Sequence, residues 1–335
     1  MMGKCLKVLS NVPVFWFAAL LILAPSARAY GEKSITASFT STSGAFTALW
    51  VAQESQSFAK YGVNVTLAYI AGGSKAVAVL LAGEAPITMS SGESLVRARL
   101  SGGSVVAIAT HTYTFVASLM VLPEIKTAAD LKGKTLGISR FGTTPHLGTL
   151  MALQRLGLNP NTDVAIRQMG GIPEAFAAMQ SRQIQGGYLP APLNLQVQKR
   201  GFNALVDLGT LNIPYDQSLL LGSQKLIQRD RSLVLDFLKG YVAGIARAKR
   251  DKAFTKSVMS KYTRVKDDEI LEYSYKIFIE TYLNKAPIPH PEAIQTVLDF
   301  VKEQEPKARQ AKPEEFIDAS LVKQLEDSGF VASLY

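Results

Sequence analysis

Cysteine is nearly absent from this sequence: the 335 residues include a single one, Cys5. Beyond it the chain has no thiol nucleophile, no thiolate metal ligand and no pair of cysteines for a disulfide. Histidine is also scarce, and His111, His146 and His290 are too far apart in sequence for metal-ligand spacing. The patterns G-x-S-x-G, H-E-x-x-H and the P-loop are missing as well. No familiar nucleophile, metal or nucleotide-phosphate motif is therefore present, although a catalytic acid–base pair would leave no such pattern.

Long runs of one charge are missing too. The chain has 36 Lys and Arg against 27 Asp and Glu, a net charge of +9 at pH 7, and these residues are dispersed. A nucleic-acid-binding protein would gather its Lys and Arg in a stripe or patch, so this class is disfavoured. The hydrophobic content of 47% excludes intrinsic disorder. The positive balance suits either solubility or an anionic solute.

The N-terminus has the layout of a secretory signal peptide. Lys4 and Lys7 precede an apolar run over residues 12–24, and Ala27-Arg28-Ala29 places small residues at the positions that signal peptidase reads. We expect cleavage after Ala29 and a periplasmic location. An uncleaved membrane anchor is the alternative, but the run is short for spanning a bilayer. The remaining 306 residues carry 33 basic and 27 acidic side chains, a net charge of +6.

Two series of alternating strands and helices follow, which is typical of βαβ units with parallel strands. Expected strands of the first series are 34–39, 63–70, 85–90, 105–110 and 116–122. Expected strands of the second are 135–138, 164–168, 186–188 and 204–207, and one more is expected at 217–223. From Lys225 onward the pattern is helical. We expect two α/β lobes with a cleft between them, followed by C-terminal helices.

The turns at the carboxyl ends of the expected strands are rich in hydroxyls and glycine. In open α/β sheets ligands bind at these ends, and glycines, helix N-termini and hydroxyls together suit a ligand with oxygen atoms. Helix capping is the alternative explanation for any single turn. The candidate ligand-binding residues are Ser41, Thr42, Gly73, Ser74, Ser90, Ser91, Tyr113, Arg140, Thr143, Thr144 and Tyr188. Arg140 is the one cation near these turns and suits a carboxylate, sulfonate or phosphate; a solvated surface position is its alternative.

Three segments resemble substrate-binding proteins of nitrate/sulfonate/taurine-type ABC importers, the SsuA/TauA-like family. "FAKYGVNVTLAYIAGGSKAVAVLLAGEAPITMSSG" is similar to that family's F-x-K-x-G-V-x-V step with its Gly-Gly/Ser turn and L-x-A-G-E-x-x-I. "IKTAADLKGKTLGISRFGTTPH" is similar to its entry into the second lobe, and "IPEAFAAMQSRQIQGGYLPAP" to its A-(L/M)-x-x-G-x-I-D-(A/G) segment. The resemblance covers roughly residues 34–245. It departs at Gln185-Gly186-Gly187, where the family often has Asp.

The resemblance implies an α/β, two-lobed periplasmic binding protein fold (type II), each lobe a mainly parallel sheet flanked by helices. The first lobe would hold residues 30–122 and 216–335 and the second 123–215, with crossings near 122–125 and 209–215. It also implies a monomer that binds a solute at the residues above and delivers it to the permease and ATPase subunits of an ABC importer. We expect no enzyme activity, no cofactor and no metal, and a small organic anion as solute, a sulfonate or carboxylate, aromatic or aliphatic.

Two other functions use the same scaffold. An exported enzyme would need a catalytic base, which the sequence does not display. A fungal relative that makes the thiamine pyrimidine uses a histidine and a cysteine-rich iron site, which does not match a chain without cysteine after residue 29. A ligand-presenting partner of a membrane sensor would need the same cleft as an importer component.

Overall fold

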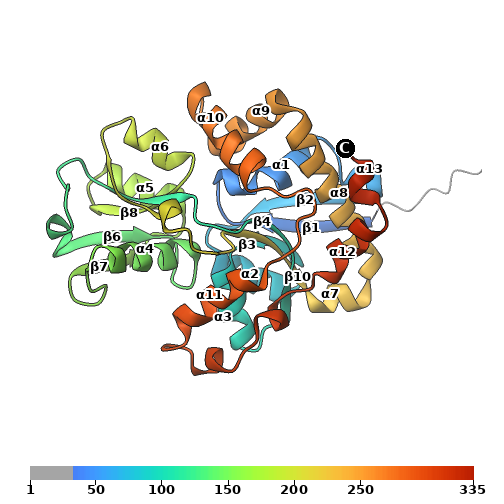
Figure 1. Ribbon diagram of the computed structural model, residues 1–335, viewed down its shortest axis with the longest axis horizontal. Coiled ribbons are helices and arrows are strands. Elements are labelled where there is room, and N and C mark those ends of the chain that lie inside the picture. The colour runs from blue at the N-terminus through green and yellow to red at the C-terminus, as the bar shows by residue number, and fades with distance from the viewer. Residues whose placement is uncertain (1–32) are drawn as a thin grey trace, which may run out of the picture. The chain divides into compact units, whose positions relative to one another are not determined.

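The strands are arranged in two five-stranded sheets (Figure 1). The structure is a computed structural model, and it describes residues 33–335. The expected signal peptide and its cleavage site lie outside the described residues. No helix in the described range is both long and apolar enough to span a membrane.

The first sheet has the order β2-β1-β3-β10-β4. β1 pairs in parallel with β2 and β3, whereas β10 is antiparallel to both β3 and β4. Its strands are β1 (Lys33–Phe39), β2 (Val63–Tyr69), β3 (Ile87–Ser90), β4 (Val105–Thr112) and β10 (Ser218–Ser223). β4 is buried along its whole length, which explains the unbroken apolar run of its first five residues, 105–109.

The second sheet repeats this arrangement in the order β7-β6-β8-β5-β9. β6 pairs in parallel with β7 and β8, and β5 is antiparallel to β8 and β9. Its strands are β5 (Ala117–Val121), β6 (Lys134–Ile138), β7 (Val164–Gln168), β8 (Gly186–Pro190) and β9 (Asn203–Asp207). Each sheet is thus mostly parallel, with one antiparallel strand as its fourth member, as expected for the two-lobed fold.

Helices flank both sheets. Those of the first series are α1 (Thr47–Glu54), α2 (Gly73–Ala82) and α3 (Gly92–Leu100). Those of the second are α4 (Thr144–Arg155), α5 (Ile172–Gln180) and α6 (Leu193–Gln198). The helices after β10 are α7 (Gln224–Arg229), α8 (Arg231–Arg250), α9 (Lys252–Thr263), α10 (Asp268–Tyr275), α11 (Pro291–Val301), α12 (Ser320–Asp327) and α13 (Phe330–Ser333).

One strand lies in a different sheet from the one we expected. The segment at 116–122 was expected to close the first series, but β5 pairs with β8 and β9 in the second sheet. The first crossing between the sheets therefore lies at residues 113–116, between β4 and β5, and not at 122–125, so the lobe boundary expected at residue 122 is too late. The reason is that an apolar strand can pair in either sheet. Only its pairing with β8 and β9, which come later in the sequence, places this strand in the second sheet.

The two crossing segments lie side by side. Tyr215 N donates to Tyr113 O at 3.0 Å, and Gln217 N donates to Thr112 O at 2.9 Å. The rings of Phe115 and Tyr215 stack with centroids 4.1 Å apart and planes 2° from parallel. The return crossing thus agrees with the expected 209–215 and is attached to the outgoing one by backbone hydrogen bonds and an aromatic stack.

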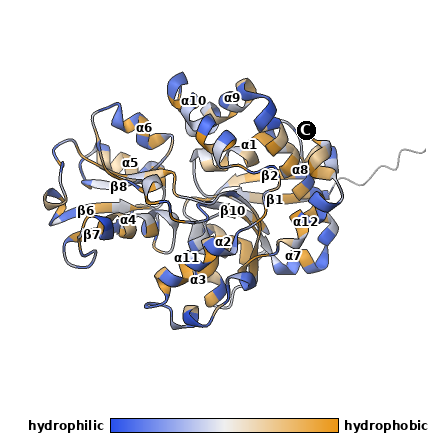
Figure 2. Ribbon diagram, viewed as in Figure 1, coloured by the Kyte–Doolittle hydropathy of each residue, from blue (hydrophilic) through white to orange (hydrophobic). Residues whose placement is uncertain are grey.

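The core is divided into two buried clusters, one between the first sheet and α1, α8 and α9, the other including the second sheet with α3, α4 and α11. Trp50 on α1 is fully buried and stacks on Tyr262 of α9, 4.7 Å between ring centroids. Outer helices such as α9, α10 and α12 carry both hydrophilic and hydrophobic residues (Figure 2), as amphipathic helices that cover a core do.

Candidate functional site

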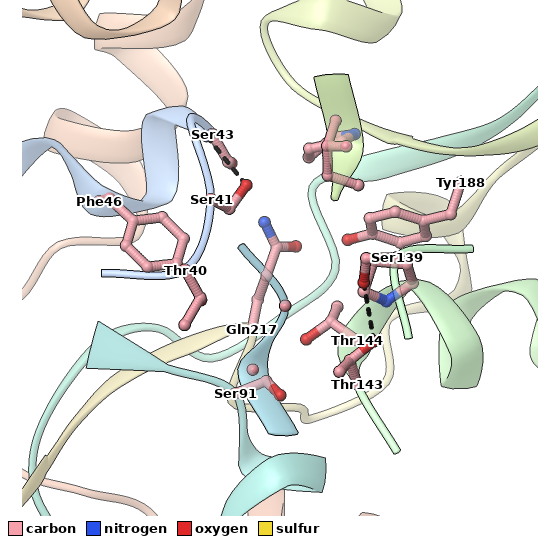
Figure 3. A pocket seen from close by; sticks show the side chains of 15 residues that line it. Thr40, Ser41, Ser43, Phe46, Ser91, Ser139, Thr143, Thr144, Tyr188 and Gln217 are labelled. Carbon is pink, nitrogen blue, oxygen red and sulfur yellow. Dashed lines mark hydrogen bonds between the residues drawn. The ribbon is translucent and has the colours of Figure 1, made fainter. Parts of the chain in front are cut away.

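A small cavity lies where the carboxyl ends of strands from both sheets meet (Figure 3). Its volume is about 40 Å³. The first sheet lines it with the turns after β1, β2 and β3: Thr40, Ser41, Ser43, Phe46, Gly72, Gly73 and Ser91. The second sheet contributes Ser139, Thr143, Thr144, Pro145, Ile172, Tyr188 and Pro190, and the return crossing contributes Gln217. The cavity is therefore an interlobe site at the strand ends, where the sequence pattern indicated one.

Helix N-termini converge on this cavity. Gly73 begins α2, Ser91 is the N-cap of α3, Thr144 begins α4 and Ile172 begins α5. The unpaired N–H groups of a helix's first turn and its dipole favour negative charge at that end. Gly72, which caps α2, has φ +84°, a left-handed conformation that glycine adopts without strain. None of the fifteen lining residues has a charged side chain, so these helix ends supply the positive potential at the cavity wall.

The threonines of α4 do not cap the helix through their side chains. Thr143 Oγ1 donates to Arg140 O at 2.6 Å and lies 3.0 Å from Ser139 Oγ. Thr144 Oγ1 lies 2.8 Å from the Tyr215 hydroxyl. Ser91, in contrast, is a true cap, accepting from Ser94 N at 3.3 Å. The capping explanation therefore holds for Ser91 and fails for the two threonines.

Tyr188 presents an unpartnered group to the cavity. Its side chain comes from β8, and its hydroxyl is buried without a hydrogen-bond partner among the described residues (Figure 3). Burial raises the pKa of Tyr188 well above its usual value, with a smaller effect from Tyr215, so the hydroxyl stays protonated. A buried hydroxyl without a partner is costly. A ligand oxygen in the cavity would satisfy it.

Gln217 reaches the cavity from the return crossing. Its Oε1 accepts from Val116 N at 2.6 Å, on the outgoing crossing. That bond orients the amide and leaves the Nε2 hydrogens as donors on a cavity-lining side chain. One residue thus joins both crossings to the cavity wall.

Six of the eleven candidate residues line the cavity: Ser41, Gly73, Ser91, Thr143, Thr144 and Tyr188. The other five lie elsewhere. Ser74 is exposed on the first turn of α2. Thr42 lines a separate groove, described below. Ser90, the last residue of β3, is buried behind Gly73: its Oγ lies 2.7 Å from where a Cβ on Gly73 would sit.

Tyr113 and Arg140 are held by other partners. Tyr113 is 37% exposed, and its ring lies 4.8 Å from that of His290. Arg140 lies across the cleft against the turn after β2: its Nε donates to Ala71 O at 3.4 Å, and its Cδ lies 2.6 Å from a Cβ built on Gly72. The expectation that Arg140 faces the cavity is not met by its position, because its side chain bridges the two lobes instead.

Several lining residues are not among the eleven candidates predicted from the sequence. Gly72 and Ser139 belong to turns that also contain predicted ligand-binding residues. Their place in these turns could have identified them as lining residues. Gln217 had no local signal, since it reaches the cavity only because the two crossings pair. Gly186 and Gly187, two of the three residues at which the chain departs from the family pattern, lie on β8, where a Cβ would meet backbone: Met120 O at 2.8 Å and Gly137 O at 2.7 Å. Close strand packing accounts for these two glycines.

None of the three histidines lines the cavity. His111 is fully buried, and burial together with the charge of Lys249 lowers its pKa to about 3. His146 Nδ1 lies 3.3 Å from Glu93 Oε1, and Glu93 also pairs with Arg97 at 3.0 Å. Within residues 33–335 no cluster of three His, Cys, Asp or Glu side chains could hold a metal ion.

Known structures share this architecture. A protein from Bordetella bronchiseptica RB50 superposes with a TM-score of 0.75 at 17% identity, covering 89% of this chain and 98% of that one. The alkanesulfonate-binding protein SsuA from Xanthomonas axonopodis pv. citri, bound to MOPS, has a TM-score of 0.69 at 16% identity over 81% and 93% of the two chains. The periplasmic aliphatic sulphonate binding protein SsuA from Escherichia coli has a TM-score of 0.63 at 16% identity over 81% and 87%. Identities this low show the fold alone.

Sequence comparison shows the family. A candidate ABC transporter periplasmic binding protein from Brachyspira hyodysenteriae is 30% identical over 115 residues, which is 34% of this chain and 32% of the relative. The match thus spans about a third of that relative. The NMT1/THI5-like family matches residues 43–252, more than half of the chain. The chain has the two-lobed fold of ABC-type periplasmic solute-binding proteins and belongs to the NMT1/THI5-like family.

Proposed function

We propose that this protein is the periplasmic solute-binding component of an ABC importer and that it captures a small organic anion in the interlobe cavity. The observation that carries the proposal is the cavity itself, which is lined by hydroxyls, an amide and helix N-termini from both lobes and by no charged side chain. Such walls donate hydrogen bonds to an oxyanion without neutralising it.

The class of anion follows from these donors. Sulfonates and carboxylates both present several oxygens to converging N–H and O–H groups. Proteins named as alkanesulfonate-binding share the fold, which puts sulfonates first among the solutes to test. The unpartnered Tyr188 hydroxyl would donate to one of these oxygens.

Closure of the two lobes would present the solute to a permease, whose ATPase drives transport. The crossings at 113–116 and 208–217 are the only two connections between the sheets within residues 33–335 and would act as the hinge. We propose that the protein reaches the periplasm through cleavage after Ala29 and acts there as a monomer. Intact mass and N-terminal sequencing of the exported protein would test the cleavage.

A thermal-shift screen of residues 30–335 tests the function. The panel holds alkane- and arenesulfonates, taurine, nitrate, carboxylates, phosphonates and neutral analogues. A ligand at 100 times its dissociation constant stabilises the fold by about 2.7 kcal/mol, a shift that the method detects. We expect stabilisation by one anionic class and recovery of the ligand chemically unchanged. Turnover of the ligand would favour an exported enzyme, and stabilisation by neutral analogues alone would overturn the anion.

A further inference from the structure

The cavity has room for one acidic group and little more. Its volume of about 40 Å³ has room for only a few water-sized groups, which is the size of a single acidic headgroup. Any larger body of the ligand must therefore leave the cavity, and the structure shows on which side it can do so.

Contacts between the lobes close one side of the cavity. Arg140 Nε donates to Ala71 O at 3.4 Å, and Ser94 Oγ donates to Gly142 O at 3.2 Å. Deeper on the same side, the buried Glu93 lies against His146. These contacts join α2 and α3 of the first lobe to the start of α4 in the second, so the lobes are in direct contact on this side.

A wide groove between the lobes adjoins the cavity. This outer groove has a volume of about 680 Å³, seventeen times that of the cavity. The two are neighbours, because Thr42 and Pro173 of the groove directly follow Ser41 and Ile172 of the cavity. A volume of this size lies within the usual range of ligand pockets.

The groove combines aromatic walls with positive charge. Phe39, Tyr69, Phe176 and Tyr262 contribute rings, and Arg200, Lys261 and Arg264 contribute cations, whereas no acidic side chain lines it. Tyr262 is held firmly, stacked on Trp50 and donating its hydroxyl to Glu54 at 2.8 Å.

The three cations differ in how they are engaged. Lys261 pairs with Glu54 at 2.7 Å. Arg200 and Arg264 are exposed and form no ion pair with another described residue. The groove therefore keeps two guanidinium groups available at an aromatic surface.

We infer that the outer groove is the second half of the binding site and that the solute is an elongated aromatic anion with two acidic groups. The inference rests on the proposed function: one acidic group occupies the cavity, the ring lies along Phe176 and Tyr262, and the second acidic group meets Arg200 and Arg264. Flat rings stack on aromatic walls, and guanidinium groups bind carboxylates and sulfonates in two-pronged fashion.

The test compares two series of anions by calorimetry with the 30–335 protein. The first is methanesulfonate, naphthalene-2-sulfonate and naphthalene-2,6-disulfonate; the second is acetate, 2-naphthoate and naphthalene-2,6-dicarboxylate. In the series that fits the cavity we expect the naphthyl ring to tighten binding at least tenfold and the second acidic group at least threefold more.

Variants separate the two contributions. Phe176→Ala should abolish the gain in affinity from the naphthyl ring of the ligand. Phe202→Ala is the control: the Phe202 side chain packs against Phe176 but does not line the groove, so this variant should retain the gain. Arg200→Gln combined with Arg264→Asn should remove the gain from the second acidic group only. Asn is chosen because Arg264 has φ +61°. Arg155→Gln, an exposed arginine on α4, is the control.

The measurements distinguish an error about the outer groove from an error about the proposed function. If the small anions bind and the naphthyl compounds bind equally or more weakly, the groove is not part of the site. The same holds if the gains persist in the Phe176 and double arginine variants, or if the control variants lose them equally. If no member of either series binds, the proposed capture of an organic anion is itself wrong.

Discussion

Arg140 and Gly72 face each other across the interlobe cleft, and the arginine occupies the space that a side chain on the glycine would fill. The Arg140 Cδ lies 2.6 Å from an ideal Cβ on Gly72, and Arg140 Nε donates to the neighbouring Ala71 O. The contact joins the two lobes, and Arg140 is not among the residues that line the cavity. We therefore predict that Arg140 stabilises this arrangement of the lobes and does not contact the solute.

Arg140→Ala should accordingly weaken the binding of every solute by the same factor. Loss of one hydrogen bond of the closed form costs about 0.5–1.5 kcal/mol, and a smaller closed fraction lowers all affinities alike. Titration of a charged ligand and a neutral analogue checks this. A loss confined to the charged ligand would instead place the guanidinium on the anion.

Tyr188→Phe should weaken solute binding by about 0.5–1.5 kcal/mol, because it removes a hydrogen-bond donor of the cavity. Its stability should be unchanged or higher, since the hydroxyl is buried without a partner. Tyr241→Phe is the matched control: the Tyr241 hydroxyl is also buried and unpartnered, but it lies on α8 in the core. Calorimetry and thermal unfolding of both variants measure the difference. Equal affinity of Tyr188→Phe and the parent protein would remove Tyr188 from the site.

Asp216 and His111 should have opposite effects on stability as the pH changes. Burial raises the pKa of Asp216 to about 7, although the Thr110 hydroxyl opposes the shift, and burial lowers the pKa of His111 to about 3. Between pH 3.8 and 7 the folded protein holds a proton on Asp216 that the unfolded chain has lost, so this group's contribution falls as the pH rises. Between pH 3 and 6.5 the unfolded chain holds a proton on His111 that the folded protein lacks, so that contribution rises.

Asp216→Asn should reveal how His111 changes the stability of the protein with pH. The variant keeps an acceptor for Thr110 and no longer titrates, so its stability should rise from pH 4 to 6.5 more steeply than that of the parent, by up to ~1.4 kcal/mol per pH unit. At pH 8, where the parent carries a buried carboxylate, the variant should be the more stable. Urea unfolding across this pH range checks both, with Asp327→Asn on the surface as control. Identical dependence of stability on pH in Asp216→Asn and the parent protein would contradict the raised pKa of Asp216.

Gly244→Ala should destabilise the first lobe by about 1–3 kcal/mol. A Cβ on Gly244 of α8 would lie 2.5 Å from the Ala52 Cβ of α1, so the two helices would have to separate. Ala243→Ser adds one heavy atom at the adjacent, less buried position and should cost much less. Denaturant unfolding compares the two. Equal stability of the two variants would show that α1 and α8 can move apart at little cost.

Local pattern predicted most strands and the turns that form the cavity. The expected 164–168 is β7 itself, and the expected 63–70 and 204–207 differ from β2 and β9 by one residue. Helix ends are less predictable: α1 ends at Glu54, and Gln56 has φ +55°. No glycine marks that break, so the sequence pattern continues where the helix stops.

Within the turns, sequence could not decide which neighbour faces the ligand. Ser90 and Ser91 are adjacent and chemically alike, yet the last residue of the strand is buried behind Gly73 while the next one caps α3 at the cavity wall. The direction in which a side chain points depends on the pleat of the strand and on where the helix begins, and a shift of one residue reverses it.

The sequence by itself determined the alternating α/β organisation, the family and the hydroxyl-rich turns at the strand ends, because these depend on local periodicity and residue type. Only the tertiary structure decided that β5 pairs in the second sheet, that Gln217 reaches the cavity and that Arg140 bridges the lobes. Each of these depends on contacts between segments far apart in the chain. Local preference does not specify such contacts, because they arise only when the two sheets and the crossings between them pack together.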